Sequence, residues 1–431
     1  MKSKAFAKPI FVVDGARTPF LKARVEHGPF SASDLAVSAG RELLARQPIA
    51  ATDIDEVVIG CMNPSEDEAN IGRIIAMRLG CGKHTPGWTV QRNCASGMQA
   101  IDSAMKDIAL GRADLVLAGG TEAMSRAPLI FQPQMANWFS RLNRSKSLGA
   151  KLSTMAKFKP HFLKPIISLL HGLTDPLCGF NMGQTAEKVA YQFSITREEM
   201  DQFAVESHQS ATQAVEKGHY QQLTALYSSK GKSYTHDDGV RADSSVSKLS
   251  KLKPVFDRKY GMVTAGNSSQ ITDGAAVLLL ASEEAVAKHD LKVLGVIKDV
   301  EWAGLDPTVM GLGPVMATTP ILQRHQLALS DVDCWEINEA FATQVIGCLR
   351  AWESEEFCQQ HLGCDNALGS LDKSRLNIDG GAIALGHPVG ATGARLVLRT
   401  LQILNREQKK RGIATLCIGG GQGGAMLIER V

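Results

Sequence analysis

Long apolar runs and closely spaced cysteine pairs are both missing from this sequence. No stretch reaches the ~18 apolar residues that a membrane-spanning helix needs, so no transmembrane segment is expected. The nine cysteines are odd in number, irregularly spaced and without a CxxC pair, which disfavours a zinc site and favours free thiols in a reducing compartment. Residues 1–10 lack the apolar core and the cleavage site of a signal peptide. These absences predict a cytoplasmic enzyme without a metal.

A strong excess of one charge is absent too. The formal net charge is +3 over 431 residues, which is too small to indicate a nucleic-acid partner. Hydrophobic residues make up 44% of the chain and charged residues 21%, as in ordinary globular proteins. A chain of this length can form two or three domains, each with its own hydrophobic core.

Acidic residues are absent from residues 127–174. The same stretch carries seven basic residues: Arg141, Arg144, Lys146, Lys151, Lys157, Lys159 and Lys164. Residues 162–173 are rich in leucine and isoleucine. A solvated basic loop above a core helix would explain this pattern. A surface for polyanions, such as phosphate groups, anionic lipid headgroups or an acidic partner, would explain it equally well.

Strands alternate with helices along most of the chain, which predicts an α/β fold. The first part is expected to hold strands at 9–13, 55–60, 87–90 and 114–118 and helices at 33–45, 70–79 and 96–110. A similar order returns later, with strands at 331–337, 412–418 and 425–429 and helices at 338–349 and 390–405. The repeated order predicts two pseudo-symmetric halves.

Cys94 lies where a strand-like stretch, residues 89–91, changes to a helix-like stretch, residues 95–100. A thiol at the N-terminus of a helix feels the positive end of the helix dipole, which favours the nucleophilic thiolate. Ser96 and Gly97 keep the surroundings small enough for an acyl chain to reach the sulfur. The alternative is a structural cysteine, because free cysteines are commonly buried.

Two glycine-rich segments near the C-terminus carry an imidazole and a second thiol. His387 lies between Gly386 and Pro388, whose fixed φ makes the turn rigid, and an imidazole held in this way suits a general base. The alternative is a histidine that is hydrogen-bonded within a loop. Cys417 ends a strand shortly before three glycines, residues 419–421, whose backbone N–H groups could form an oxyanion hole.

Asn338 follows the strand expected at residues 331–337. Its side-chain amide could orient a water or a carbonyl there, and helix capping is the alternative role for Asn338 and Glu339. Each of these signals is weak by itself. Their combination and order carry more information than any one of them.

The motifs in this order resemble those of the thiolases, the enzymes that cleave or form 3-ketoacyl-CoA. The resemblance covers essentially the whole chain. It rests on residues Asp14–Phe20, Asn93–Gly97, Gly119–Ser125, Asn181–Glu187, Thr264–Ser269, Asn338–Phe341, Gly386–Pro388 and Cys417–Gly421.

The resemblance implies a role for each reactive residue. It makes Cys94 the nucleophile that takes the acyl group and His387 the base that activates it. It makes Cys417 the group that moves a proton at the substrate α-carbon or the CoA sulfur. Asn338 would hold a water that binds the thioester oxygen together with His387, and the N–H groups of Cys94 and Gly419 would form a second oxyanion hole. The reaction would follow ping-pong kinetics, with coenzyme A as co-substrate and no bound cofactor.

The resemblance also implies contacts to coenzyme A. Arg241 corresponds to an arginine near the adenine nucleotide, and Ser269 to a serine at the pantetheine arm. The apolar lining corresponds to Met182, Phe256, Ala265 and Phe341. Short-chain biosynthetic thiolases usually have histidine where this chain has Asn181, which argues against a purely acetoacetyl-specific enzyme.

The implied fold has two βαβαβαββ halves in five α-β-α-β-α layers and a loop domain. The expected boundaries are 1–130 for the N-terminal half, 131–267 for the loop domain, 268–285 for a returning strand and 286–431 for the C-terminal half.

The long stretch at 352–373 and the basic segment resemble the β subunit of the fatty-acid-oxidation trifunctional complexes. This subfamily implies a degradative 3-ketoacyl-CoA thiolase that forms a homodimer or homotetramer. An α subunit or a membrane surface would then contact the basic segment.

Three other functions stay open. An acetoacetyl-CoA thiolase would run the reaction as a condensation. A ketoacyl-carrier-protein synthase shares the fold and nucleophile but uses a histidine-based site, so it would not need Cys417. A non-catalytic lipid-binding relative would be expected to lose one of the reactive residues, and all are present here.

Overall fold

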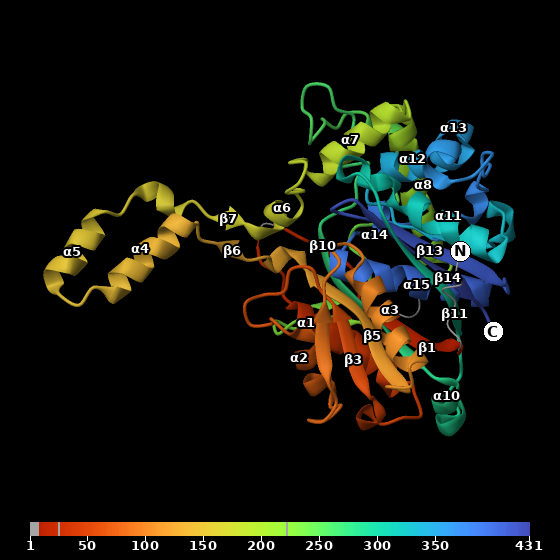
Figure 1. Cartoon of the computed structure of the whole chain (residues 1–431), viewed down its shortest axis with the longest axis horizontal. Coiled ribbons are helices and arrows are strands. Elements are labelled where there is room, and N and C mark those ends of the chain that lie inside the picture. Colours follow the sequence, from red (N-terminus) through yellow and green to blue (C-terminus); the bar gives the residue numbers. More distant parts are fainter. Residues whose placement is uncertain (1–7, 25, 221–222) are drawn as a thin grey trace.

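The computed structural model describes residues 8–24, 26–220 and 223–431 and has an α/β fold (Figure 1). The predicted absence of a signal peptide rests largely on residues 1–7, which lie outside the described residues. Among the described residues, no helix combines the length and hydrophobicity that crossing a bilayer requires.

One large sheet runs through the molecule and has two parts. The N-terminal part contains β1 (Ile10–Arg17), β3 (Glu56–Gly60), β4 (Gly87–Val90), β5 (Leu115–Ala123) and β10 (Thr272–Ala281). The C-terminal part contains β11 (Gly295–Gly304), β12 (Cys334–Ile337), β13 (Arg411–Ile418) and β14 (Gln422–Glu429). The strand order is β12-β13-β14-β11-β1-β10-β5-β3-β4, and antiparallel pairing of β11 with β1 joins the two parts.

The two parts of the sheet repeat one topology. In the N-terminal part, the first strand β1 pairs with the last strand β10, and β10 pairs with β5. In the C-terminal part, the first strand β11 pairs with the last strand β14, and β14 pairs with β13. The strand β4 runs parallel to β3, and Leu376 forms a parallel bridge to Trp335 of β12 at the equivalent place. The predicted pseudo-symmetric halves are therefore confirmed.

Helices form three layers around the two parts of the sheet. The central layer consists of α3 (Ser96–Ala109) and α15 (Val389–Arg406), which contact each other and share one hydrophobic core with strands of both halves. The N-terminal part is covered by α1 (Ala32–Ala45) and α2 (Ile71–Leu79), and the C-terminal part by α11 (Gly313–His325) and α12 (Ala342–Glu353). This is the five-layer arrangement that the sequence predicted.

A close backbone crossing fixes how α15 lies against β5. A Cβ atom at Gly120 of β5 would lie only 1.9 Å from the carbonyl oxygen of Gly390 in α15. No side chain fits between two backbones at this distance, so glycine is required at Gly120. The crossing sets the position of α15, and His387 lies just before this helix.

Most predicted elements begin and end within a few residues of the observed ones, with one informative exception. The helix expected at 338–349 begins only at Ala342, with Phe341 as its N-cap residue. Asn338 and Glu339 lie in a buried loop instead, because their side chains hydrogen-bond other segments. Helix capping by Asn338 or Glu339 is therefore wrong.

The loop region between β5 and β10 contains the helices α7 (Met182–Gln192), α8 (Arg197–Glu216) and α9 (Val246–Leu249). Short elements complete the chain: β2 (Leu21–Lys22), β8 (Leu226–Tyr227), β9 (Ser233–Tyr234), α10 (Glu283–His289), α13 (Glu355–Phe357) and α14 (Ala382–Leu385). The predicted domain boundaries at 130, 267 and 285 stay a prediction.

The acid-free stretch forms an arm that extends away from the body (Figure 1). Its stalk is the antiparallel pair β6 (Leu129–Ile130) and β7 (Ile166–Ile167), and its far end holds α4 (Pro133–Arg144) and α5 (Leu148–Ala156). The short helix α6 (Ser168–Gly172) returns the chain to the body. The alternative of a core helix under this segment is wrong, since Leu163, Ile167 and Leu170 are 44–56% exposed.

Candidate active site

The loops between strands and helices bring the reactive residues of both halves together. Cys94 lies between β4 and α3, and His387 lies before α15 in the other half. Cys417 lies near the end of β13, 1% exposed, and His387 is 7% exposed. Cys94 and His387 therefore come from different halves, and the packing between the halves sets their relative position.

Two backbone N–H groups lie close enough to the sulfur of Cys94 to affect the pKa of its thiol. Burial raises the pKa of the Cys94 thiol, and hydrogen bonds from the N–H groups of Gly419 and of Cys94 itself lower it. Cys94 also lies two residues before Ser96, the first residue of α3. These groups stabilise a thiolate once a base removes the proton.

The hydrogen bonds of His387 define which nitrogen carries its proton. The hydroxyl of Thr392 donates to the carbonyl oxygen of Pro388 at 3.0 Å and lies 2.7 Å from Nδ1 of His387. Because a hydroxyl has one proton, Thr392 accepts a hydrogen bond from Nδ1–H. The Nε2 atom is then free of a proton and can act as the base.

The ring of His387 stays neutral over the physiological range. Burial and the nearby positive charge of Arg395 lower its pKa to about 3. A neutral imidazole can accept the proton of Cys94, whereas an imidazolium cannot.

Asn338 lies beside the free nitrogen of His387. Its Nδ2 is 3.4 Å from Nε2 of His387, and its Oδ1 has no hydrogen-bond partner among the described residues although Asn338 is fully buried. A buried amide oxygen without a partner is costly. A water or substrate group bound here would satisfy it.

Cys417 is a buried thiol close to Cys94. Burial raises its pKa well above the ordinary value, and the neighbouring thiols of Cys94 and Cys348 act in the same direction. Cys417 therefore rests as a protonated thiol, which can supply a proton before it takes one.

The predicted apolar lining is partly assembled next to these residues. Met182 and Phe256 pack against one hydrophobic cluster with Phe341 and Cys417. The rings of Phe256 and Phe341 meet edge to face at 5.9 Å between centroids. The sulfur of Met182 lies 3.3 Å from the position a Cβ of Gly419 would take.

The other predicted coenzyme A contacts lie further toward the surface. Ser269 donates its backbone N–H to the carbonyl oxygen of Ala340, and Ala265 is exposed. Arg241 is also exposed, and its backbone N–H donates to Nδ1 of the buried His208. Asn181, which stands where short-chain biosynthetic thiolases usually have histidine, is the N-cap residue of α7.

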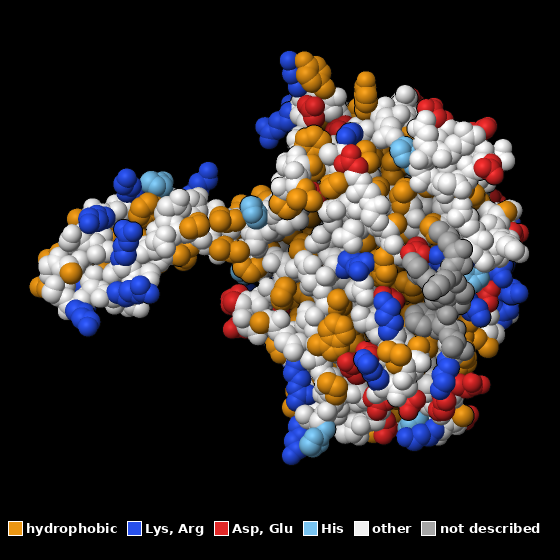
Figure 2. All heavy atoms as spheres, viewed as in Figure 1, with side chains coloured by type: hydrophobic (Ala, Val, Ile, Leu, Met, Phe, Trp, Pro, Cys, Tyr) orange, Lys and Arg blue, Asp and Glu red, His pale blue; other side chains and the backbone are white. Residues whose placement is uncertain are grey.

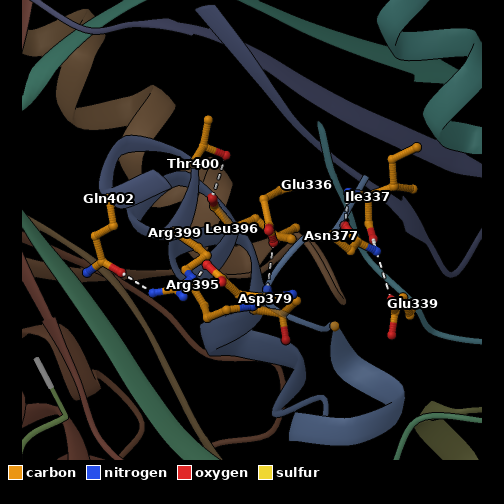
Figure 3. Close-up of polar contacts among 12 residues, drawn as sticks. Glu336, Ile337, Glu339, Asn377, Asp379, Arg395, Leu396, Arg399, Thr400 and Gln402 are labelled. Atoms are coloured by element: carbon orange, nitrogen blue, oxygen red, sulfur yellow. Dashed lines mark hydrogen bonds and ion pairs between the residues drawn. The ribbon is translucent and has the colours of Figure 1, made fainter. Parts of the chain in front are cut away.

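A buried layer of charged residues lies near the segments that carry Asn338 and His387, and Figure 3 shows several of its members, among them Glu336 and Arg395. Arg395 of α15 donates to the carboxylate of Glu336 of β12 at 2.8 Å, and both side chains are at most 2% exposed. Glu336 lies two residues before Asn338, and Arg395 lies two helical turns after His387. The pair therefore connects the strand that leads to Asn338 with the helix that follows His387.

Asn377 holds the backbone just before Asn338 (Figure 3). Its side chain accepts from the N–H of Ile337 at 3.0 Å and donates to the carbonyl oxygen of Ile337 at 2.9 Å. The same amide donates to the carboxylate of Glu339 at 2.8 Å. The side chain thus replaces a neighbouring strand at the end of β12.

Glu122 connects the two halves at the end of β5. Its carboxylate accepts hydrogen bonds from the N–H groups of Met62, Asn63 and Gly390 at 2.9–3.0 Å. Burial nevertheless raises its pKa to about 7. Gly390 belongs to the first turn of α15, so Glu122 holds the helix that follows His387.

The ionisation of Glu336 makes a pH-dependent prediction. Burial raises its pKa to about 7 from the ordinary 4.5, although Arg395 and Arg399 oppose this shift. Between these values the folded state binds the proton more tightly than the unfolded state, so the stability contributed by Glu336 falls as pH rises. The wild-type protein should lose free energy of unfolding between about pH 5 and about pH 8, and we expect Glu336→Gln to remove up to about 3 kcal/mol of that loss.

Urea unfolding of the wild-type protein and of Glu336→Gln at both pH values measures this effect. Subtracting one curve from the other cancels the contribution of Glu122, which is present in both proteins. Parallel stability curves would show that Glu336 keeps an ordinary pKa in the fold.

Reasoning from the sequence missed several residues that support the site: Thr392, Asn377, Arg395, Glu336, Glu122 and Asn93. Thr392 follows His387 by five residues, which places it in the first turn of the next helix and is the one usable signal. The others act through contacts between distant segments, which spacing along the chain does not reveal.

Comparison with known proteins agrees with this architecture. The family model described as "Thiolase, N-terminal domain" matches residues 10–284, and "Thiolase, C-terminal domain" matches residues 291–430. The 3-ketoacyl-CoA thiolase of Serratia proteamaculans is 37% identical over 97% of this chain and 96% of its own length. The protein of the same name from Yersinia enterocolitica is 35% identical with the same coverage.

Solved structures show the same relationship. The crystal structure of Bacillus anthracis acetyl-CoA acetyltransferase is 34% identical, has a TM-score of 0.84 and covers 100% of both chains. Human mitochondrial 3-ketoacyl-CoA thiolase in complex with CoA is 33% identical, has a TM-score of 0.84 and covers 99% of both chains. With matches across both halves and nearly the full length, the chain is a member of the thiolase family of acyltransferases.

Proposed function

We propose that this chain is a 3-ketoacyl-CoA thiolase that cleaves its substrate with coenzyme A through an acyl group on Cys94. The observation that carries the proposal is the assembly of Cys94, His387 and Asn338 in one site, where Asn93 joins the Cys94 segment to Gly419 by a hydrogen bond of 2.8 Å and Asn338 lies 3.4 Å from Nε2 of His387. His387 is suited to act as the base, because its contact with Thr392 puts the ring proton on Nδ1 and leaves Nε2 without one. The relatives named 3-ketoacyl-CoA thiolase support this substrate class.

The first half of the reaction transfers the acyl group. Nε2 of His387 takes the proton of Cys94, and the thiolate attacks the 3-keto carbon of the substrate. The C2–C3 bond breaks, its electron pair stays on the acetyl-CoA fragment, and the thiol of Cys417 protonates that fragment. A water held by Asn338, together with His387, stabilises the negative oxygen of the leaving thioester.

The second half releases the shortened acyl-CoA. The Cys417 thiolate takes the proton of incoming coenzyme A, and the CoA thiolate attacks the acyl-Cys94 carbonyl. The N–H groups of Cys94 and Gly419 stabilise the tetrahedral oxyanion. The Cys94 thiolate then leaves and recovers its proton from His387, so both thiols return to their starting state.

The degradative, broad-chain assignment is tested by comparing substrates. Thiolysis of acetoacetyl-CoA and of medium- and long-chain 3-ketoacyl-CoA should be measured at matched concentrations, with Cys94→Ala as control. A higher kcat/KM for the longer substrates supports the proposal. Activity restricted to acetoacetyl-CoA, or seen only as condensation of acetyl-CoA, would favour the acetyl-CoA acetyltransferase alternative.

The contacts to coenzyme A are part of the same proposal. Burial lowers the pKa of Lys22, and the positive charge of Arg241 acts in the same direction, so these two basic residues lie close together, which supports a nucleotide phosphate site in this region. Ser269, Ala265, Met182, Phe256 and Phe341 would line the path from there to Cys94.

The arm supports a peripheral contact with an anionic membrane surface. Its seven basic residues have no acidic neighbours within the stretch, and Leu129 and Leu148 are 66% and 75% exposed. Figure 2 shows basic and hydrophobic side chains side by side on the arm. Mixed exposure of this kind suits a lipid interface, which takes up both apolar side chains and positive charge.

A charge-reversed arm tests this contact. We expect the variant with Arg141, Arg144, Lys151 and Lys157 changed to glutamate to lose sedimentation with anionic vesicles, because each basic residue contributes about 1 kcal/mol near such a surface. Vesicles of zwitterionic lipid should not sediment either protein. Unchanged sedimentation with anionic vesicles would contradict the proposal, and loss of a co-purified α subunit instead would identify the arm as a protein-binding surface.

A homodimer or homotetramer and a cytoplasmic location stay predictions. The edge position of β4 in the large sheet supports a dimer, because an edge strand can pair with a second copy.

A further inference from the structure

Asn93, the residue before Cys94, has an unusual backbone conformation. Of the six non-glycine residues with positive φ that the structure describes, four lie at the C-terminal ends of helices: Ser194, Asp290, Gln326 and Gln408. A left-handed residue is common there because it closes the last helical turn. Asn377, with φ of 44°, follows the short 3-10 helix Lys373–Arg375, whereas Asn93, also with φ of 44°, lies before the N-terminus of α3 and next to Cys94.

The side chain of Asn93 crosses from one half of the molecule to the other. Its Nδ2 donates to the carbonyl oxygen of Gly419 at 2.8 Å. Its backbone carbonyl oxygen accepts from the N–H of Ser96 at 3.1 Å and from the Ser96 hydroxyl at 2.7 Å. The first turn of α3 thus fixes Asn93, and Asn93 in turn holds Gly419.

Consecutive residues contact the two sides of the same glycine. Asn93 holds the carbonyl of Gly419, while the N–H of Gly419 lies close enough to the sulfur of Cys94 to lower the pKa of its thiol. The chain after this glycine is intrinsically free to rotate, since Gly420 and Gly421 follow it with φ of 91° and 74°. A hydrogen bond to the Gly419 carbonyl restricts that rotation and keeps the N–H aimed at the sulfur.

We propose that Asn93 is a positioning residue for the reaction: its side-chain amide holds Gly419 so that the Gly419 N–H faces the Cys94 sulfur and the oxyanion that forms on the acyl group. This inference rests on the proposed role of Cys94 as the nucleophile. Asparagine meets both requirements, because it tolerates a left-handed φ better than other non-glycine residues and carries an N–H donor on a short side chain.

Two substitutions separate the amide from the backbone conformation. Asn93→Gly keeps the left-handed φ without strain and removes the donor. Asn93→Asp keeps the size but places a carboxylate oxygen against the Gly419 carbonyl and beside Cys94. Gln91→Ala is the matched control, because Gln91 contacts Asn93 at its Oδ1 and does not reach Gly419.

The measurements are kcat, the KM for coenzyme A, and the pH dependence of Cys94 alkylation by iodoacetamide. For Asn93→Gly we expect kcat to fall roughly 10- to 100-fold, somewhat less than the ~10²- to 10³-fold that loss of an oxyanion donor costs. The pKa of alkylation should rise and KM should change less than about twofold, because Asn93 acts through the thiolate and oxyanion rather than through CoA binding. Asn93→Asp should show larger changes in the same direction, and Gln91→Ala should match wild type.

Wild-type kcat and alkylation pKa in Asn93→Gly would overturn the inference. A loss of kcat with an unchanged alkylation pKa would overturn it as well, since that result describes a residue needed only for folding. Alkylation at a residue other than Cys94, or activity in Cys94→Ala, would instead refute the proposed nucleophile. Thermal unfolding of each variant shows whether the fold is intact.

Discussion

Cys94→Ala is expected to lose thiolysis almost completely, with kcat reduced by roughly 10⁴-fold or more. Removing the nucleophile of a covalent mechanism leaves only binding and oxyanion stabilisation, which retain a small part of the rate enhancement. The substitution removes one sulfur from a partly buried position and leaves the hydrogen bond from Asn93 to Gly419 untouched. Steady-state assays with a 3-ketoacyl-CoA and coenzyme A measure the loss.

Binding of coenzyme A gives the control for this variant. The dissociation constant of coenzyme A should change little, because the expected nucleotide contacts around Arg241 are distant in sequence and lie at the surface. Cys81→Ala is a matched substitution of another free cysteine that lies in the hydrophobic core of the N-terminal half. Residual activity in Cys94→Ala close to that of Cys81→Ala would exclude Cys94 as the nucleophile.

Cys417→Ala is expected to have the second largest effect on activity. Proton transfer at the α-carbon of the substrate should be the step that it slows most. Wild-type enzyme should exchange the α-protons of acetyl-CoA with solvent deuterium, because the Cys417 thiolate that forms in the reaction removes and returns such a proton. Without this thiol we expect exchange and thiolysis to fall by roughly 10²- to 10⁴-fold, the usual contribution of general acid–base catalysis. Mass spectrometry of recovered acetyl-CoA measures the exchange.

Cys348→Ala is the matched control for this second variant. Cys348 is also fully buried, lies near Cys417 and donates to the carbonyl oxygen of Gly311. It should exchange α-protons at the wild-type rate. If Cys417→Ala exchanged as fast as Cys348→Ala, another base would have to serve the α-carbon.

The sequence predicted the features that depend on local patterns. A change from strand-like to small, helix-like residues placed Cys94 before a helix, and α3 begins two residues later. The glycines around His387 and after Cys417 indicated close backbone approach, which the contact of Gly120 with Gly390 displays in one place. The repeated order of strands and helices predicted the two halves, because β-strand and helix periodicities are local.

Features that depend on contacts between distant segments could not be predicted. The helix expected from Asn338 begins later because Glu339 accepts hydrogen bonds from Ser207, Asn377 and Ile383, which lie far away in the sequence. Which nitrogen of His387 carries the proton could be inferred only from the observed hydrogen bond of the Thr392 hydroxyl to the carbonyl oxygen of Pro388. The projection of residues 127–174 as an arm likewise followed only from the structure, since composition allowed a packed helix as well.

Contacts between the halves explain how a duplicated fold brings Cys94 and His387 together. Glu122 reaches from the N-terminal half to Gly390, and Asn93 reaches from the same half to Gly419. These two side chains hold the segments that carry His387 and Gly419. Together with the pairing of β1 with β11, they set the position of one half relative to the other more sharply than apolar packing alone would.

Direct detection of the acyl-enzyme tests the central claim. The enzyme should be mixed with a medium-chain 3-ketoacyl-CoA in the absence of free coenzyme A, quenched with acid and digested for peptide mass spectrometry. The proposed mechanism predicts a shortened acyl group on the peptide that contains Cys94, with one acetyl-CoA released per acylated site. An acyl group on Cys417, or turnover without any acylated peptide, would contradict the mechanism.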